Sequence, residues 1–169
     1  MKPSKNSISI AGEFAVLSQL ALRGVDANLT LGNTKSVDIL ASDPETGTMF
    51  KLEVKTSYSQ KPGISKVWGR TLSWVMGAKH EDITDPGLFY CFVNIEKEAS
   101  TFRFFIVPSR VVANHVRESH HFWLNNNEVW QVEHVDTSIR RFRLGVEDGN
   151  YSVDTPLARD YENNWVFHG

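Results

Sequence analysis

The chain has 169 residues, a length that fits one domain with a sizeable hydrophobic core, and residues 1–169 are treated as that single domain. Hydrophobic residues make up 41% of the chain and charged residues 22%, which excludes a globally disordered protein. The single cysteine, Cys91, excludes an internal disulfide, and no apolar run approaches the length of a membrane span. We therefore expect a cytoplasmic protein that does not enter a membrane.

Charge is distributed unevenly along the chain. The net charge is −2, which argues against a generic nucleic-acid binder. Between residues 51 and 79, however, six basic residues accompany a single acidic residue, Glu53. Such a segment can create a local positive field for a polyanion. A lysine-rich solvated loop is the alternative explanation.

The first third of the chain predicts a helix followed by a three-strand meander. In residues 12–24, Phe14, Leu17 and Leu20 recur at helical spacing, and Gly24 is a natural stop. Strands are expected at residues 27–31, 36–42 and 49–57, with a turn at residues 32–33.

The remainder predicts a second helix, two strands and a third helix. We expect a helix within residues 68–80, a strand at 87–95 that is buried on both faces, and its hairpin partner at 101–107. Ser109 is the expected N-cap of a helix over 110–119, and Leu157, Tyr161 and Trp165 fit a short terminal helix. This order predicts an α/β fold with a mixed β-sheet core flanked by helices.

The stretch "KLEVKT", residues 51–56, carries the most informative polar pattern. Its alternation places Glu53 and Lys55 on one face of a strand. If the strands at 36–42 and 49–57 pair, Asp38 lies near Glu53 when it points to the same face. Two adjacent carboxylates repel unless a cation lies between them, and Mg²⁺ prefers such oxygen ligands. An ordinary surface ion pair between Glu53 and Lys55 remains the alternative.

Glu13 lies at the start of the apolar stripe of the first predicted helix. A carboxylate on the core side of a helix is costly unless it is paired or binds a metal. The alternative is that Glu13 lies at the N-terminus of the helix, where the macrodipole favours an acidic side chain.

Residues 12–57, "GEFAVLSQLALRG…VDILASDPETGTMFKLEVKTS", resemble the PD-(D/E)xK nuclease superfamily, in particular small members related to Holliday-junction resolvases and restriction-endonuclease-like proteins. One departure is Val37, which stands where the family usually has proline. The resemblance implies that Glu13, Asp38 and Glu53 coordinate Mg²⁺, with Mn²⁺ as a substitute, and that Lys55 assists the attacking water. It implies a restriction-endonuclease-like core that cuts phosphodiester bonds, and by analogy a homodimer.

Basic and hydroxyl side chains that follow Lys55 are candidates for binding the DNA backbone. They are Thr56, Ser57, Lys61, Lys66, Arg70 and Lys79. Trp68 and Trp74 lie among them and either stack on an unpaired base or belong to the core of the second predicted helix. His115, His120 and His121 are not spaced for a zinc site, and we expect them to be structural.

The sequence therefore predicts a metal-dependent DNA endonuclease, with branched or structured DNA as a candidate substrate. Two alternatives stay open: a catalytically inactive interaction or regulatory protein with the same fold, and a nuclease directed at RNA.

Overall fold

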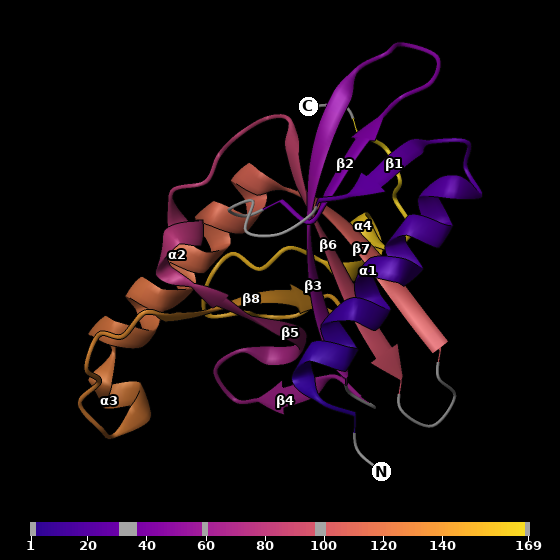
Figure 1. Ribbon diagram of the computed structural model, residues 1–169. Helices are drawn as coiled ribbons and strands as arrows, with labels where there is room; N and C mark the ends of the chain where they lie inside the picture. Colours follow the sequence, from indigo (N-terminus) through magenta and orange to yellow (C-terminus); the bar gives the residue numbers. More distant parts are fainter. Residues whose placement is uncertain (1–2, 31–36, 59–60, 97–100, 168–169) are drawn as a thin grey trace.

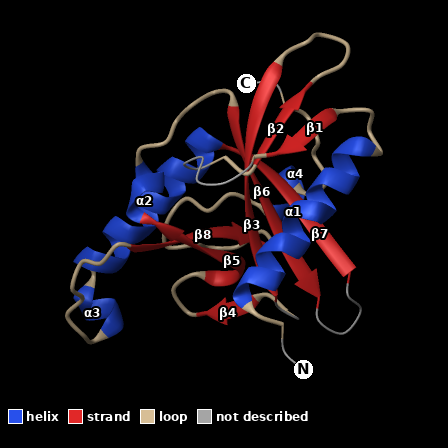
Figure 2. Ribbon diagram, in the orientation of Figure 1, coloured by secondary structure: helices blue, strands red, loops and turns tan. Residues whose placement is uncertain are grey.

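The computed structural model describes residues 3–30, 37–58, 61–96 and 101–167 (Figures 1 and 2). The helices are α1 (Lys5–Ala21), α2 (Ser109–Asn125), α3 (Asn127–Trp130) and α4 (Ala158–Tyr161), with a 3-10 helix, η1 (Ala78–Glu81). The strands are β1 (Asp26–Leu29), β2 (Ile39–Ser42), β3 (Met49–Tyr58), β4 (Gly63–Ser65), β5 (Gly69–Gly77), β6 (Leu88–Glu96), β7 (Thr101–Pro108) and β8 (Ile139–Gly145).

A five-stranded mixed sheet with the order β1-β2-β3-β6-β7 forms the centre of the fold. The predicted meander is present, because β1, β2 and β3 pair antiparallel, with Ile39 opposite Leu52. β3 pairs parallel with β6, and β6 forms the predicted antiparallel pair with β7. The predicted fold class, a mixed α/β sheet flanked by helices, is confirmed. The turn predicted at residues 32–33 lies outside the described residues.

The hydrophobic core forms two layers, one on each face of this sheet. Because side chains alternate along a strand, β6 contributes Phe89, Cys91 and Val93 to the layer beneath α1, and Tyr90 and Phe92 to the opposite layer. The second layer is closed by a three-stranded sheet of order β4-β5-β8 and by α2 (Figure 1). β6 is therefore buried on both faces, as its apolar sequence predicts.

Helix α1 approaches β3 closely at Gly12. A Cβ atom added at Gly12 would lie 1.9 Å from Oγ1 of Thr56, so a side chain there requires a shift of the helix or of Thr56. Figure 1 shows α1 crossing in front of β3 and β6. The glycine allows the helix that carries Glu13 to lie directly against the strand that carries Lys55.

The helix predicted within residues 68–80 is wrong, since this segment forms β5 followed by η1. Leu72, Trp74 and Met76 are buried, whereas Val75 between them is exposed, which is the two-residue period of a strand. Trp68 and Trp74 are buried as core residues, although not in a helix, and Nε1 of Trp74 donates a hydrogen bond to the Val93 carbonyl oxygen at 3.0 Å.

Two predicted helix starts differ from the structure. Helix α1 begins at Lys5, with Ser4 accepting a hydrogen bond from the Ser7 amide at 3.0 Å, so Glu13 lies in the helix interior and not near its N-terminus. Ser109 is the first residue of α2 and not its cap. Its hydroxyl donates a 2.6 Å hydrogen bond to the Asp85 carbonyl oxygen instead.

The predicted terminal helix is shorter than expected, whereas Cys91 and His115 are buried structural residues, as expected. The terminal helix is only α4, which includes Tyr161 but ends before Trp165. Cys91 is fully buried, and His115 lies in the core with Nδ1 bonded to the Asp154 carbonyl oxygen at 3.0 Å. None of the helices that the structure describes is both long enough and apolar enough to span a bilayer.

Candidate active site

The β2–β3 hairpin brings Asp38 beside Glu53. The Asp38 amide donates a hydrogen bond to the Leu52 carbonyl oxygen at 2.8 Å, which extends the pairing of the two strands by one residue. Its carboxylate Oδ2 accepts a second bond from the Val54 amide at 2.7 Å. Hydrogen bonds from both its backbone and its side chain thus hold Asp38 against β3, the strand that carries Glu53 and Lys55.

Glu53 is buried, with 2% of its surface exposed, and its two carboxylate oxygens have different surroundings. Oε1 lies 2.6 Å from Nζ of Lys55 and 3.1 Å from Nε2 of His80. Oε2 is buried and accepts no hydrogen bond of ordinary geometry from the described residues, although the Tyr90 hydroxyl lies near this carboxylate, whose charge adds to burial in raising the pKa of Tyr90. A buried polar atom of this kind is costly unless something absent from the protein chain satisfies it.

Opposing effects set the charge of Glu53. Burial alone would raise the pKa of this carboxyl, but the hydrogen bond with His80 and the charge of Lys55 outweigh burial and lower the pKa to about 2. Glu53 is therefore ionised at neutral pH despite its burial.

Asp38 and Glu13 are shifted in the other direction. Burial raises the pKa of Asp38, and the nearby Glu53 charge adds to this effect, while the Val54 amide and Lys55 oppose it. Burial also raises the pKa of Glu13, and the charge of Asp38 reinforces the shift. Glu13 itself accepts a hydrogen bond from Ser9 at 3.3 Å. The four predicted site residues thus form one electrostatically coupled group in which carboxylates repel one another.

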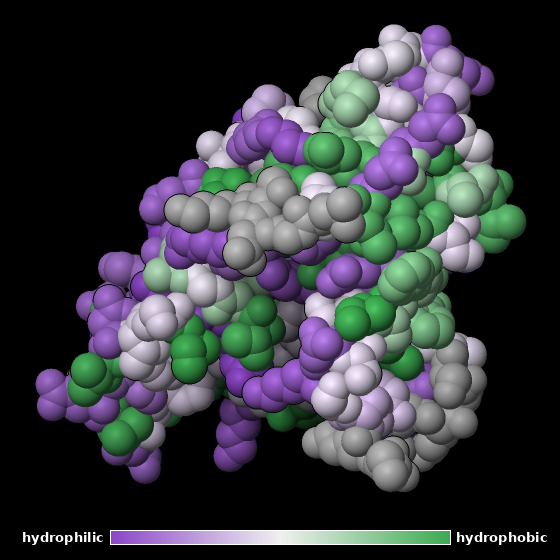
Figure 3. Space-filling model, in the orientation of Figure 1, coloured by the Kyte–Doolittle hydropathy of each residue, from purple (hydrophilic) through white to green (hydrophobic). Residues whose placement is uncertain are grey.

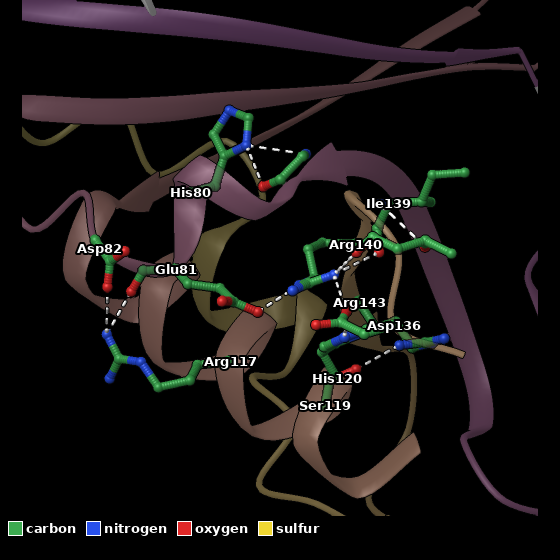
Figure 4. Close-up of polar contacts among 12 residues, drawn as sticks. His80, Glu81, Asp82, Arg117, Ser119, His120, Asp136, Ile139, Arg140 and Arg143 are labelled. Atoms are coloured by element: carbon green, nitrogen blue, oxygen red, sulfur yellow. Dashed lines mark hydrogen bonds and ion pairs between the residues drawn. The ribbon is translucent and has the colours of Figure 1, made fainter. Parts of the chain in front are cut away.

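His80 is a site residue that the sequence reasoning missed. It is 3% exposed, and its Nδ1 is anchored by the Gly77 backbone, with N and O at 3.0 and 2.8 Å (Figure 4). This anchor directs Nε2 at Glu53. The strand pattern of residues 69–77 would have placed His80 just beyond a strand end, but the helix prediction concealed that position.

The residues present fit a hard divalent cation held by few protein ligands. Oε2 of Glu53 accepts no hydrogen bond of ordinary geometry from the described residues, and the Asp38 carboxylate lies beside it. Among the described residues, His, Cys, Asp and Glu side chains form no group of three or more that makes a ready metal cage. Mg²⁺ keeps several waters and uses one or two protein carboxylates, so the pair meets its requirement.

An open cleft of about 800 Å³ adjoins this group and carries positive charge. Its basic lining residues are Lys5, Lys55, Lys61 and Arg141. None of the described residues that line it is acidic. The cleft runs between the start of α1, the C-terminal half of β3 and residues 71–75 of β5. A surface of this kind suits a polyanion.

Only some of the residues predicted to bind the DNA backbone line the cleft. Thr56, Ser57 and Lys61 line the cleft. Lys79 lies near the site, where its charge lowers the pKa of Asp38 against the larger effect of burial. Arg70 lies away from the cleft lining, with Nη1 3.5 Å from Oε2 of Glu147.

Lys66 also lies outside the lining, in the turn between β4 and β5. Lys5 and Arg141, which do line the cleft, were not predicted. Both come from parts of the chain distant from residues 51–79, and only the fold brings them there.

Comparisons with known proteins agree on the fold alone. No protein-family model matches the chain, and no curated protein matches it in sequence. The solved structure of a bacterial homing endonuclease, I-Ssp6803I, is similar in fold, with a TM-score of 0.54 and 15% sequence identity. The match covers 96% of this chain and 91% of that one. The chain therefore shares, over nearly its whole length, the fold of an endonuclease.

Proposed function

We propose that the protein is a metal-dependent endonuclease of the PD-(D/E)xK type that hydrolyses phosphodiester bonds in DNA. The observation that carries the proposal is the pair of carboxylates, Asp38, hydrogen-bonded to β3 just before β2 begins, and Glu53 on β3. Lys55, which lines the basic cleft, lies 2.6 Å from Glu53. Similarity in fold to a homing endonuclease supports it. The proposal includes the family assignment, which rests on the order Glu13, Asp38, Glu53, Lys55 in the sequence.

Glu13, Asp38 and Glu53 would hold the Mg²⁺ or Mn²⁺ ion. The bound ion supplies Lewis-acid stabilisation of charge on the phosphoryl oxygens and acidifies a coordinated water. Lys55, the cleft-lining member of the group, places a positive charge next to the scissile phosphate and helps to orient the attacking water. Ser57, which points to the same face of β3 as Lys55, offers a hydroxyl donor to the same phosphate, and Lys5, Lys61 and Arg141 bind the flanking backbone. The Thr56 hydroxyl is buried against Gly12 of α1 on the opposite face and takes no part.

His80 has a positioning role in this proposal. Its hydrogen bond to Oε1 of Glu53 keeps the carboxylate ionised and leaves Oε2 available as a ligand. An outer-shell partner that orients a ligand in this way commonly changes metal affinity when it is replaced.

Cleavage assays test the proposal against its alternatives. Purified protein is incubated with plasmid, linear duplex, branched DNA and RNA of matched sequence, in Mg²⁺, Mn²⁺ or EDTA. We expect cleavage of DNA with either ion and none in EDTA. Asp38→Asn should abolish it, whereas Asp26→Asn, an exposed carboxylate on the edge strand β1, should not.

The same assays separate the other possibilities. Binding without cleavage under all conditions would support an inactive interaction or regulatory protein, and preferential cutting of RNA would support an RNA nuclease. Equal cleavage by wild type and Asp38→Asn would refute the assignment of the site.

We also propose that the protein acts as a homodimer, because a cut in both strands requires two sites. Ile10 and Phe14, one turn apart on α1, are 43% and 59% exposed. Figure 3 shows hydrophobic side chains on the face of the molecule that α1 covers. Light scattering should give about twice the 19.2 kDa chain mass, and Phe14→Glu should give the monomer. A monomeric wild type would contradict this assembly.

A further inference from the structure

A second pocket, of about 410 Å³, lies apart from the carboxylate group, where α2 and the α3 segment meet β8. Three tryptophans line it, namely Trp68, Trp123 and Trp130. Three arginines of β8 line it as well, namely Arg140, Arg141 and Arg143. The volume lies toward the small end of the range for small-molecule sites, roughly 300–1,000 Å³.

Neighbouring rings hold these tryptophans in place. Trp123 is stacked on His134 with ring centroids 4.0 Å apart, and Trp68 contacts Trp130 at 5.9 Å. The edge of Phe122 meets Trp68 at 5.6 Å. Rings fixed before a ligand arrives lose little conformational entropy on binding, so the pocket is preorganised for a flat aromatic group.

Arg143 supplies a positive charge inside the pocket. Its guanidinium lies 4.0 Å from the centroid of the Trp68 ring, and Nη1 donates a 2.7 Å hydrogen bond to the Ser119 hydroxyl (Figure 4). Burial lowers the pKa of Arg143 to about 10, so it stays charged at neutral pH. Arg140, in contrast, is paired with Glu81 and Asp136.

Arg141 connects this pocket to the basic cleft. It lines both, and it projects from the same face of β8 as Arg143 because the two are separated by one residue. Figure 1 shows β8 running from the side of α3 toward the middle of the molecule, beneath β3. A phosphate chain in the cleft therefore meets positive charge that continues into the aromatic pocket.

We propose that this pocket binds an unpaired nucleobase of the strand that occupies the cleft. The inference deepens the proposed function, since it rests on nucleic acid as the ligand of the cleft. Every nucleobase has a π face that stacks on tryptophan, and the arginines meet its phosphates. A base inside a duplex cannot enter such a pocket without leaving the stack. The protein should therefore prefer DNA with an unpaired nucleotide next to a duplex.

Equilibrium binding in EDTA tests this preference without any requirement for cleavage. Fluorescence anisotropy compares a blunt duplex with the same duplex carrying a short single-stranded overhang. Because one base stacked on an aromatic ring changes affinity by roughly 5- to 150-fold, we expect the overhang substrate to bind more tightly by that factor. Trp123→Ala should remove the preference and leave blunt-duplex affinity unchanged, while Trp123→Phe should retain most of it.

A matched control is Trp165→Ala, which removes another half-buried tryptophan, packed on Phe104 away from both sites. It should leave both affinities unchanged. A free deoxynucleoside monophosphate added as competitor distinguishes a strand-bound base from a mononucleotide site. If the monophosphate binds and the overhang preference is absent, the pocket serves a free nucleotide and the inference is wrong.

Three outcomes distinguish an error in the base-binding pocket from an error in the proposed nuclease activity. Cleavage with equal affinity for blunt and overhang DNA overturns the pocket and leaves the nuclease intact. If the protein prefers the overhang substrate through Trp123 but does not cleave DNA in Mg²⁺, the proposed nuclease activity is wrong and base binding in the pocket is supported. Absence of any DNA binding overturns both.

Discussion

Replacing Gly12 by alanine tests the close packing of α1 on β3. The added Cβ would lie 1.9 Å from Oγ1 of Thr56 and 3.0 Å from its Cβ and Cγ2. Thr56 cannot easily move away, because it lies in β3 opposite Val93 of the parallel neighbour β6. The helix must therefore shift, and with it Glu13.

Two effects of opposite sign set the expected magnitude. Forcing an extra carbon into a packed interface costs typically about 1–3 kcal/mol, and a contact this short falls at the upper end. Alanine is better than glycine in a helix by about 1 kcal/mol, which offsets part of the cost. We expect Gly12→Ala to lower the free energy of unfolding by about 2 kcal/mol.

Urea denaturation followed by tryptophan fluorescence measures this change, and a double-mutant cycle identifies its cause. Thr56→Ala removes Oγ1 and Cγ2, so the double variant Gly12→Ala/Thr56→Ala should recover at least about 1 kcal/mol relative to additivity. The reasoning would be refuted if Gly12→Ala stabilised the protein, as at an open helix position, or if the two substitutions were strictly additive.

Two further predictions concern charged pairs. The pKa of Glu53 is about 2 in the folded protein and 4.5 ordinarily, so the ionised carboxylate stabilises the fold by roughly 3 kcal/mol above about pH 4.5. This stabilisation is lost as the pH falls toward 2. The urea midpoints of wild type and Glu53→Gln should therefore converge in acid, and a constant gap would contradict this. Arg103 makes a half-buried bidentate pair with Glu162, at 2.7 and 2.9 Å, so Arg103→Ala should cost about 1–3 kcal/mol in urea. Arg159→Ala breaks an equally well-formed but exposed pair with Asp148 and should cost clearly less than Arg103→Ala. Equal losses of stability in the two variants would count against the role of burial.

The central part of the site could be predicted because it depends on local periodicity. Alternation along residues 49–57 places Glu53 and Lys55 on one face, and the turn-linked strand before it places Asp38 alongside. These relations need only a hairpin, whose register follows from the apolar pattern of its two strands.

Other parts of the site could not be predicted because they depend on contacts between distant segments. His80 reaches Glu53 only because β5 is a strand that leads into η1, and its apolar residues were interpreted as a helix. The buried position of Oε2 of Glu53 is a property of packing that no spacing reveals. Likewise, Lys5 at the start of α1 and Arg141 in β8 reach the cleft from segments far apart in the sequence.

The single-turnover rate of DNA cleavage in Mg²⁺, measured at saturating protein, reports whether Lys55 acts on the reacting phosphate. The comparison is between Lys55→Met and Lys61→Met, since both lysines line the cleft but only Lys55 lies 2.6 Å from Glu53. Loss of a group that acts on the reacting phosphate should lower the rate by roughly 10²-fold or more in Lys55→Met. Lys61→Met should weaken binding and leave the saturated rate near that of wild type. A Lys55→Met enzyme that cuts as fast as wild type would contradict the account.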